Sequence, residues 1–472
     1  MIKFLFKYEW LHFTRNRFQL FILFLTALLG FYAIYYGCTE IQKQRQVIEQ
    51  VKQLQAKQLV KIEEGFNADT TTKEGKKAWQ LAAVPGFAWH KHQYAAIFTP
   101  SALAPLSIGQ RDLQPYYYKL SAMSLYYQIF QNEIANPQKL LAGNFDLSFV
   151  LIYLFPLVII AFCYSILSSD KDKGVLPLLK SQAVPVHKIM LIKLLFYFVL
   201  LFSTAIILCI VGFIFSEISF SVEYDKVFAW VGTVLVYFLF WFTLLFLIIS
   251  FNRNSAFNAI SGIGLWLLFL IIIPALINIM ITVAMPLNTT ILSGISRRMG
   301  VANEEDDANQ KAVIREFLHH HPDFKKVDTT KNLYGKGHAA FTVLRDQESK
   351  NLVENYQNQV KERDQIAGHF NVINPAVRAQ NLFDAISESN LYAFQRFNHS
   401  VTAYHQTLVK FYYSKLFSDE NFVKSDYLQA PQFTEQKASE ATDYPIISGM
   451  MQLLIISLIL FVAAYVVAQK NT

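Results

Sequence analysis

The fold is decided between residues 147 and 215, where a short charged segment separates two long apolar runs. The first run is LSFVLIYLFPLVIIAFCYSIL (147–167), the charged segment begins SSDKDKGVLPLLK (168–180), and the second run is Ile189–Phe215. A bilayer core of about 30 Å takes roughly 20 apolar residues as a helix. Both runs are therefore predicted to cross a membrane, with residues 168–188 as the loop between them.

Four further runs of this kind occur in the 472 residues, of which 53% are hydrophobic and only 16% charged. Apolar residues that are concentrated in long runs along the chain are typical of a membrane protein. We predict a mainly α, polytopic membrane protein in which Pro274 kinks or tilts the fifth span. The first span is too long for a signal peptide and lacks a cleavage site. The six predicted transmembrane helices are 18–36, 147–167, 189–215, 227–251, 256–285 and 444–468.

Lysine and arginine gather in the segments that six spans place on one side of the membrane. These residues are Lys3, Lys7, Arg15, Arg17, Lys171, Lys173, Lys180, Lys188, Arg253 and Lys470. Short cytoplasmic loops carry such an excess of positive charge. Residues 1–17 and the tail 469–472 are therefore predicted to be cytoplasmic. The net charge of +7 is largely this bias, so no nucleic-acid partner is expected.

This orientation places residues 37–145 and 286–443 outside, and both are too long to be simple connectors. We predict two large, mostly helical extracytoplasmic regions. Apolar residues at helical spacing in 40–64 predict a helix that continues the first span and packs on its own domain, rather than forming an intermolecular coiled coil. Residues 84–118, aromatic and interrupted by Pro and Gly, predict irregular or short-stranded structure near the membrane surface.

In the second outer region, residues 353–366 and 376–413 have helical periodicity. The latter predicts one or two long helices with a shared, core-facing side. That side comprises Leu382, Ile386, Phe394, Phe397, Val401 and Tyr404.

Motifs for catalysis are missing from the sequence. Gly335-Lys336-Gly337 lacks the spacing and the hydroxyl of a phosphate-binding loop, so the chain is not expected to hydrolyse ATP or to be an enzyme. The histidines at 319–321, 90, 92, 399 and 405 are interpreted as ordinary surface residues, because their spacing does not bring several onto one face. No metal or cofactor is expected on this chain. Cys38, Cys163 and Cys209 do not make a disulfide framework.

The first 17 residues alternate apolar and charged side chains, as in a helix lying in the cytoplasmic membrane interface. This interfacial helix supplies one group of candidate site residues. They are Lys3, Lys7, Tyr8, Trp10 and Arg15.

The interfacial helix, the six spans and the loop after the second span together resemble the membrane subunit of an ABC transporter of the ABC-2 type. The family's loop commonly reads Glu-x-Glu-x-Gly-Thr-Leu. In this chain Asp170 and Asp172 take the glutamate positions. Gly174 and Leu176 match, and Val175 replaces the threonine. Pro185 and Lys193 also match the family's proline before the third span and the lysine near its start.

The resemblance implies that the loop 168–188 is the interface with an ATPase. Its candidate coupling residues are Asp170, Asp172, Gly174, Val175, Leu176 and Leu179. A short helix there would transmit closure of the ATPase as a rigid-body motion. The alternative interpretation is an ordinary charged turn.

The stretch from Asn374 to His405 resembles the outer region of a bacterial permease branch known only as a domain of unknown function, although residues 387–390 depart from its usual Gly-Thr-Asp-like turn. The resemblance implies a bacterial inner membrane subunit that forms a homodimer, or a heterodimer with a second permease. Membrane lipid surrounds it, and a separate ATPase subunit carries ATP and Mg. The expected activity is export or extraction of an amphiphile. One alternative is mechanotransmission to periplasmic partners, and another is a non-energised scaffold or receptor.

Overall fold

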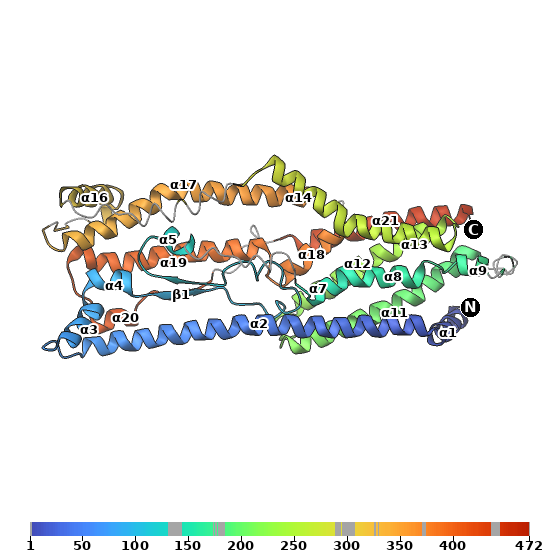
Figure 1. Cartoon of the computed structure of the whole chain (residues 1–472), viewed down its shortest axis with the longest axis horizontal. Coiled ribbons are helices and arrows are strands. Elements are labelled where there is room, and N and C mark those ends of the chain that lie inside the picture. The colour runs from blue at the N-terminus through green and yellow to red at the C-terminus, as the bar shows by residue number, and fades with distance from the viewer. Residues whose placement is uncertain are drawn as a thin grey trace.

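The computed structural model shows an elongated, almost entirely helical molecule with both chain ends at one end of a helix bundle (Figure 1). We call this end the terminal end, and the half of the molecule away from it the distal half. The structure describes residues 2–130, 144–172, 174, 177, 185–287, 294, 307–324, 327–328, 330–370, 374–435 and 444–471.

Six helices in the described residues are long and apolar enough to cross a membrane, as the sequence predicts. Two of them are composite, because each contains a π-helical segment. They are α2 (Arg17–Phe66), the composite Leu147–Asp172, α11 (Val186–Phe215), α12 (Tyr224–Ser250), the composite Ser255–Ala284 and α21 (Ile446–Asn471). The first composite comprises α7 (Leu147–Phe149), η1 (Val150–Leu154), α8 (Phe155–Cys163) and α9 (Ser168–Asp172). The second comprises α13 (Ser255–Leu267), η2 (Leu268–Ile272) and α14 (Ile273–Ala284).

Helix α2 runs without a break for 50 residues along the whole molecule (Figure 1). This confirms the predicted continuation of the first span as a helix. Ile41, Ile48, Val51 and Ile62 are buried against the rest of the chain, which fits an amphipathic helix on its own domain. Leu54 departs from the pattern and is exposed. Asn16 separates α2 from the short helix α1 (Ile2–Arg15) and caps α2 through its side chain.

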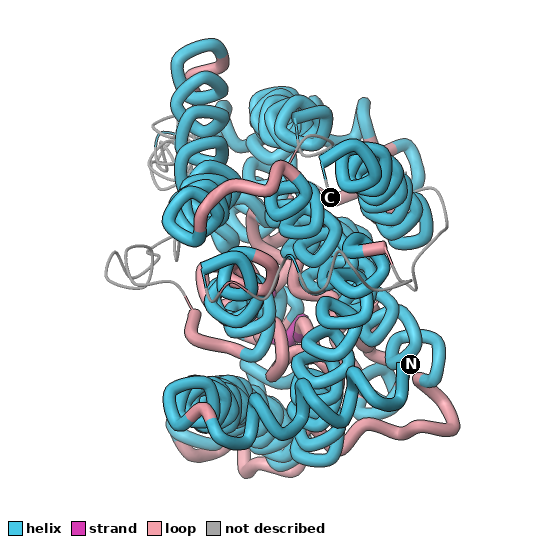
Figure 2. The backbone as a smooth tube through the Cα atoms, turned by 90° about the vertical axis from the view of Figure 1, so that its right-hand side faces the viewer, coloured by secondary structure: helices cyan, strands magenta, loops and turns pink. Residues whose placement is uncertain are grey.

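Helix α12 is the most enclosed of the six apolar helices, and it packs against α8, α11, α13 and α21. Figure 2 shows the helix bundle from the end that carries both termini. Trp230, Tyr237 and Trp241 of α12 are almost fully buried and belong to the main apolar core. Aromatic side chains supply large buried area, so α12 is the centre of bundle stability. The three cysteines are unpaired.

The distal half combines both long segments that the sequence places outside the spans. The first segment supplies α3 (Lys73–Ala83), α4 (Pro85–Lys91), β1 (Tyr94–Ile97), β2 (Tyr117–Leu120) and α5 (Leu125–Phe130). The second supplies α16 (Asp307–His320), η3 (Pro322–Phe324), α17 (Leu333–Phe370), α18 (Pro375–Ile386), α19 (Leu391–Ser418) and α20 (Lys424–Leu428). Strands β1 and β2 pair antiparallel, with Tyr94 opposite Leu120.

Both segments contribute to one apolar core in the distal half. Trp89 and Tyr94 come from the first segment, and Phe397, Tyr412 and Tyr413 come from the second. The predicted short strands in 84–118 are therefore present and lie against α19. The two segments stabilise each other and do not have separate cores.

The predicted stripe on 376–413 forms two helices, α18 and α19, and faces two different cores. Ile386 of α18 packs with the spans, whereas Phe397 and Val401 of α19 pack in the distal core. Leu382 contacts Val236 and Leu453 of two spans. Helix α18 therefore joins the two halves, as the continuous helix α2 also does.

Candidate functional site

Three charged side chains meet at the terminal end, one each from α1, α9 and α11. Lys193 Nζ lies 2.8 Å from Asp170 Oδ2 and 3.5 Å from Glu9 Oε1. The side chains of Lys193 and Glu9 are only 12% and 6% exposed. Burial of an unpaired charge is costly, so each of the three depends on the others. We call Glu9, Asp170 and Lys193 the terminal cluster.

The inner face of α1 explains why Glu9 enters this cluster. Phe6, Glu9 and Phe13 are three and four residues apart, so they share one side of the helix. The Phe6 ring meets Phe196 of α11 edge-on at 5.6 Å, and the Phe13 ring lies 6.2 Å from Phe162 of α8. Glu9 is thus the one charged residue on an otherwise aromatic face.

The predicted residues of the interfacial helix are all exposed and lie outside the buried face of α1. They are Lys3, Lys7, Tyr8, Trp10 and Arg15. Glu9 belongs with the polar residues in the sequence pattern, but the structure buries it. The spacing of Glu9, three residues after Phe6 and four before Phe13, is the sequence feature that would have predicted its burial.

The predicted coupling residues separate into three groups. Asp170 belongs to the terminal cluster, whereas Asp172 is exposed, with Oδ2 3.5 Å from Ser255 Oγ. Gly174 is exposed in the left-handed conformation, with φ of +68° and open space around it. Val175, Leu176 and Leu179 lie outside the described residues.

The end of the second span is also attached to the start of the fifth. Ser255 Oγ lies 2.7 Å from Ser168 Oγ, and Asn258 Nδ2 donates to the carbonyl of Tyr164 at 3.0 Å. Residues 164–172 are therefore held by α13 on one side and by Lys193 on another. A displacement of the loop that follows would reach α1, α11 and α13 together.

The second and fifth spans each contain a π-helical segment immediately before a proline-containing turn. Such segments mark bends and often occur at functional positions. In the second span, side chains from neighbouring spans bind the freed carbonyls of η1. Tyr237 donates to Ile152 O at 2.9 Å, and Trp266 of the fifth span donates to Tyr153 O at 3.0 Å.

The fifth-span segment η2 is bound from the distal half. Asn374, the N-cap of α18, donates through Nδ2 to Phe269 O at 2.6 Å and accepts from Ala376 N through its other side-chain atom. The break at η2, just before Pro274, agrees with the predicted kink in this span. Asn374 therefore connects α18 to the bend of the fifth span.

Helix α18 also contacts the fourth and sixth spans. The Phe383 ring lies 4.5 Å from the Trp230 ring of α12, and Arg378 Nη1 donates to Tyr444 Oη at 2.8 Å just before α21. A single helix of 12 residues thus touches several spans at their distal ends. A movement of the fourth, fifth or sixth span would therefore displace α18.

Two buried carboxyl groups, Asp146 and Asp384, lie where α18 meets the start of the second span. Asp146 accepts from Ile108 N and Phe149 N at 2.9 Å each and from Ser148 Oγ at 2.7 Å. Ser107 Oγ lies 2.6 Å from Asp384 Oδ1 and 3.2 Å from Ser148 Oγ. We call Asp146, Ser148, Ser107 and Asp384 the carboxyl joint.

The carboxyl joint has more oxygen–oxygen contacts than hydroxyl hydrogens. Three contacts join its four side chains, but only Ser107 and Ser148 carry a hydroxyl hydrogen. One proton on a carboxyl group would therefore give every contact a hydrogen bond. Burial, together with the charge of Asp112, raises the pKa of Asp146 to about 6. Burial, together with the Asp146 charge, raises the pKa of Asp384 to about 7, although Ser107 and Gln380 donate to its carboxylate. Both carboxyl groups are therefore easier to protonate near neutral pH than ordinary aspartates.

Two histidines interpreted as surface residues are instead buried. His92 Nδ1 lies 3.1 Å from Tyr412 Oη, and His405 Nε2 lies 2.6 Å from Met123 O. Burial lowers the pKa of each to about 4, so both are neutral packing residues. Within the described residues no group of His, Cys, Asp and Glu side chains is arranged to hold a metal ion.

Comparison with known families gives one match. A family model described as a domain of unknown function (DUF3526) matches residues 289–436, which is less than half of the chain. This range includes α17, α18 and α19. No curated protein and no solved structure matches the chain.

Proposed function

We propose that this chain is the membrane-spanning subunit of an ATP-driven transporter of the ABC-2 type, energised by a separate ATPase subunit. It would lie in a bacterial inner membrane with the terminal end facing the cytoplasm. It would pair with itself or with a second permease. The lysines and arginines of α1 and of the loop after the second span support this orientation, because cytoplasmic segments are rich in them.

The terminal cluster is the observation that carries the proposal. The loop expected to meet the ATPase begins at Asp170, and Asp170 is bound by Lys193, which also binds Glu9. Force applied to this loop would reach the interfacial helix and the third span through ion pairs. An ordinary charged turn would not need a buried lysine two turns inside an apolar helix.

The mechanism then follows the second span toward the distal half. Closure of the ATPase dimer would displace residues 168–180 as a rigid body, and the bend at η1 would allow the rest of the span to follow. Trp266 would pass part of this movement to the fifth span, and Asn374 would pass it to α18. The proposed outcome is export or extraction of an amphiphile at the distal half.

Mechanotransmission without cargo is a second candidate, and the composition of the spans favours it. No charged residue occurs in 194–215, 227–250 or 255–284. Polar pathways through membrane helices usually include ionisable groups. In this alternative, α18 would transmit ATP-driven motion to a partner outside the membrane.

Affinity purification of the full chain from mild detergent, followed by mass spectrometry, tests the proposal. We expect a protein with a phosphate-binding loop motif to copurify. Changing Gly174 and Leu176 to Asp should remove it, whereas the control Lys361→Ala, an exposed charge of α17 in the distal half, should retain it. If no ATPase copurifies in several detergents, the non-energised scaffold or receptor becomes the better account.

The two energised candidates differ in what ATP does to the distal half. Both predict that ATP changes a spin-label distance between α2 and α19. Only a transporter should also move a bound amphiphile from the protein to an acceptor vesicle when ATP is supplied. A distance change with no such release would favour mechanotransmission.

A further inference from the structure

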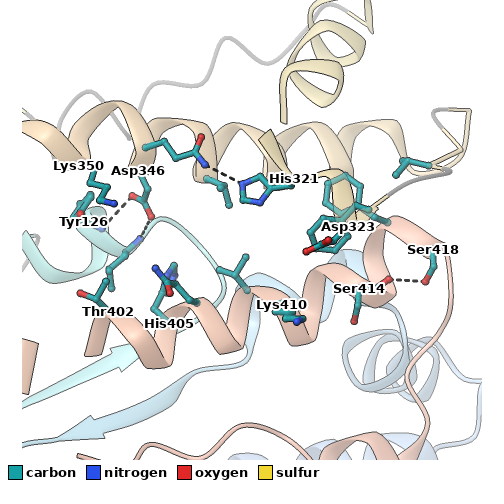
Figure 3. A pocket seen from close by; sticks show the side chains of 18 residues that line it. Tyr126, His321, Asp323, Asp346, Lys350, Thr402, His405, Lys410, Ser414 and Ser418 are labelled. Atoms are coloured by element: carbon teal, nitrogen blue, oxygen red, sulfur yellow. Dashed lines mark hydrogen bonds between the residues drawn. The ribbon is translucent and has the colours of Figure 1, made fainter. Parts of the chain in front are cut away.

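A cavity of about 600 Å³ lies in the distal half, between α17 and α19 (Figure 3). Val343, Asp346, Gln347 and Lys350 line it from one face of α17 at helical spacing. Helix α19 lines it from Thr402 to Ser418, a length of about 24 Å at 1.5 Å per residue. The cavity is thus elongated, and its volume falls within the range of small-molecule sites, about 300–1,000 Å³.

At one end of the cavity Phe324 and Phe417 lie with ring centroids 5.5 Å apart, and Asp323, Ser414 and Ser418 line the same end (Figure 3). Val409 and Val343 extend the apolar wall along the two helices. Leu125 contributes from α5 at the other end. Apolar walls of this kind take a hydrocarbon chain, because its removal from water is favourable.

Polar side chains line the whole length of the cavity, and its two basic side chains lie at the opposite end and on the rim. Lys350 lies at the far end from Asp323 (Figure 3), and its acidic neighbour, Glu354, is 3.7 Å away on the helix surface. Lys410 is exposed on the rim, and the described residues give it neither an ion pair nor a hydrogen bond. Two cations therefore line the cavity. Lys350 has Glu354 and, one turn away in the wall, Asp346 as acidic neighbours, whereas Lys410 has no ion pair within the described residues.

Asp346 does not cancel these cations as a free carboxylate would. Its oxygens accept from Ser124 Oγ at 2.5 Å and from the backbone N–H groups of Leu125 and Tyr126 at 2.6 and 3.4 Å. Both oxygens are thus engaged by α5 (Figure 3). Burial raises the pKa of Asp346 to about 6, so it remains mostly ionised at pH 7, and its charge is stabilised by these three donors. His405, also in the wall, is neutral.

We propose that this cavity binds a single-chain amphiphile with an anionic head group, the chain toward Phe324 and Phe417 and the head toward Lys350, with Lys410 on the rim between them. This inference deepens the proposed function, since it names the class of substrate, and its transport role rests on that proposal. Binding itself does not depend on an ATPase. A carboxylate and a phosphate head share the required chemistry.

The test uses the full chain in nanodiscs of zwitterionic lipid and a palmitate that carries a photoreactive diazirine. We expect labelled peptides from α17 and α19, and competition by excess palmitate or by lysophosphatidylglycerol. Stronger competition by palmitate would identify a carboxylate head group, and stronger competition by lysophosphatidylglycerol would identify a phosphate head group. Hexadecanol, which has the same chain without the charge, should compete at least tenfold less well.

Three variants sharpen the test. Lys350→Glu and Lys410→Glu should each lower labelling several-fold, and Val409→Trp should abolish it by filling the cavity. Lys361→Glu makes the same charge change on an exposed residue of α17 that does not line the cavity, and should leave labelling unchanged. Because the charge variants alter exposed side chains, they keep the test valid if Val409→Trp fails to fold.

Labelling confined to the spans would overturn the proposal, as would equal loss in Lys361→Glu and Lys410→Glu. Equal competition by hexadecanol would overturn the anionic head group. An ATPase that fails to copurify, with labelling intact, would remove the proposed transporter function but leave this binding site. The two failures are therefore distinguishable.

Discussion

The two ends of the second span are anchored in opposite ways. At the terminal end, Asp170 is held by a cation, Lys193, which also binds Glu9. At the distal end, Asp146 is held by N–H and O–H donors and lies in a chain of contacts with a second carboxyl group, Asp384. Loss of a charge would break the ion pairs at the terminal end, whereas gain of a proton would change the hydrogen bonds at the distal end.

This difference fits the two tasks proposed for the ends. An ion pair transmits force in a fixed direction, along the line that joins its two charges. A carboxyl pair that protonates near neutral pH has two nearly balanced states, which suits a joint that moves. Four variants test this difference between the two ends of the second span, beginning with the largest expected effect.

Lys193→Asp should cause the largest loss. The variant would replace the cation that pairs with Glu9 and Asp170 by a third carboxylate. Breaking a buried ion pair costs about 3–5 kcal/mol. We expect a fall in the melting temperature of the purified chain, measured by intrinsic fluorescence. The swapped double variant Asp170→Lys with Lys193→Asp should recover much of it, and the exposed control Lys188→Asp should lose little. An unchanged melting temperature in Lys193→Asp would contradict the buried ion pair.

The carboxyl joint should make stability depend on pH. The folded-state pKa of Asp384 is raised to about 7, above its ordinary value of 3.8, so the folded state binds more protons between these values. Stability should therefore fall as pH rises from about 4 to about 7, by about 2 kcal/mol or more. Asp384→Asn should reduce this dependence in urea unfolding at a series of pH values, and Asp146 and Asp346, whose pKa values are raised to about 6, should account for part of the remainder. A flat profile in the unaltered chain would show that the two carboxyl groups are not easier to protonate than ordinary aspartates.

Asn374→Ala should loosen the bend of the fifth span. It removes both the cap of α18 and the hydrogen bond to Phe269 O, a loss of about 1–2 kcal/mol. Asn390→Ala is the matched control, since Asn390 caps α19 through Ala393 N. Hydrogen exchange in residues 268–273 should accelerate in Asn374→Ala alone. Equal acceleration in both variants would mean that capping, and not the contact with η2, explains the effect.

Gly174→Ala should have the smallest effect on stability. Its positive φ costs a residue with a side chain about 1 kcal/mol, but the site is open and no clash follows. We expect little change in melting temperature together with weaker ATPase capture. Capture equal to that of the unaltered chain would argue against a role for this turn in coupling.

The sequence predicts the spans well, because about twenty consecutive apolar residues leave few alternatives. It also predicts the continuous helix beyond the first span and the two helices of 376–413, since local periodicity specifies them. Burial of His92 and His405 is not predictable in this way, because their partners, Tyr412 and Met123, are hundreds of residues distant.

The same limit applies to the candidate site. Asp170 and Lys193 are identified by their place beside the loop, but Glu9 is not, because a short amphipathic helix gives little evidence of what covers its inner face. Asp146 and Asp384 are 238 residues apart in the sequence, and only the packing of α18 on the second span brings them together. Proline positions predict bends but not the side chains that bind the freed carbonyls.

The most direct test of the account is ATP hydrolysis by the copurified complex with the terminal cluster altered and then restored. Lys193→Asp should lower the rate of hydrolysis at least tenfold, and the swapped Asp170→Lys with Lys193→Asp should restore most of it at equal amounts of bound ATPase. Hydrolysis in Lys193→Asp equal to that of the unaltered complex would contradict coupling through the terminal cluster.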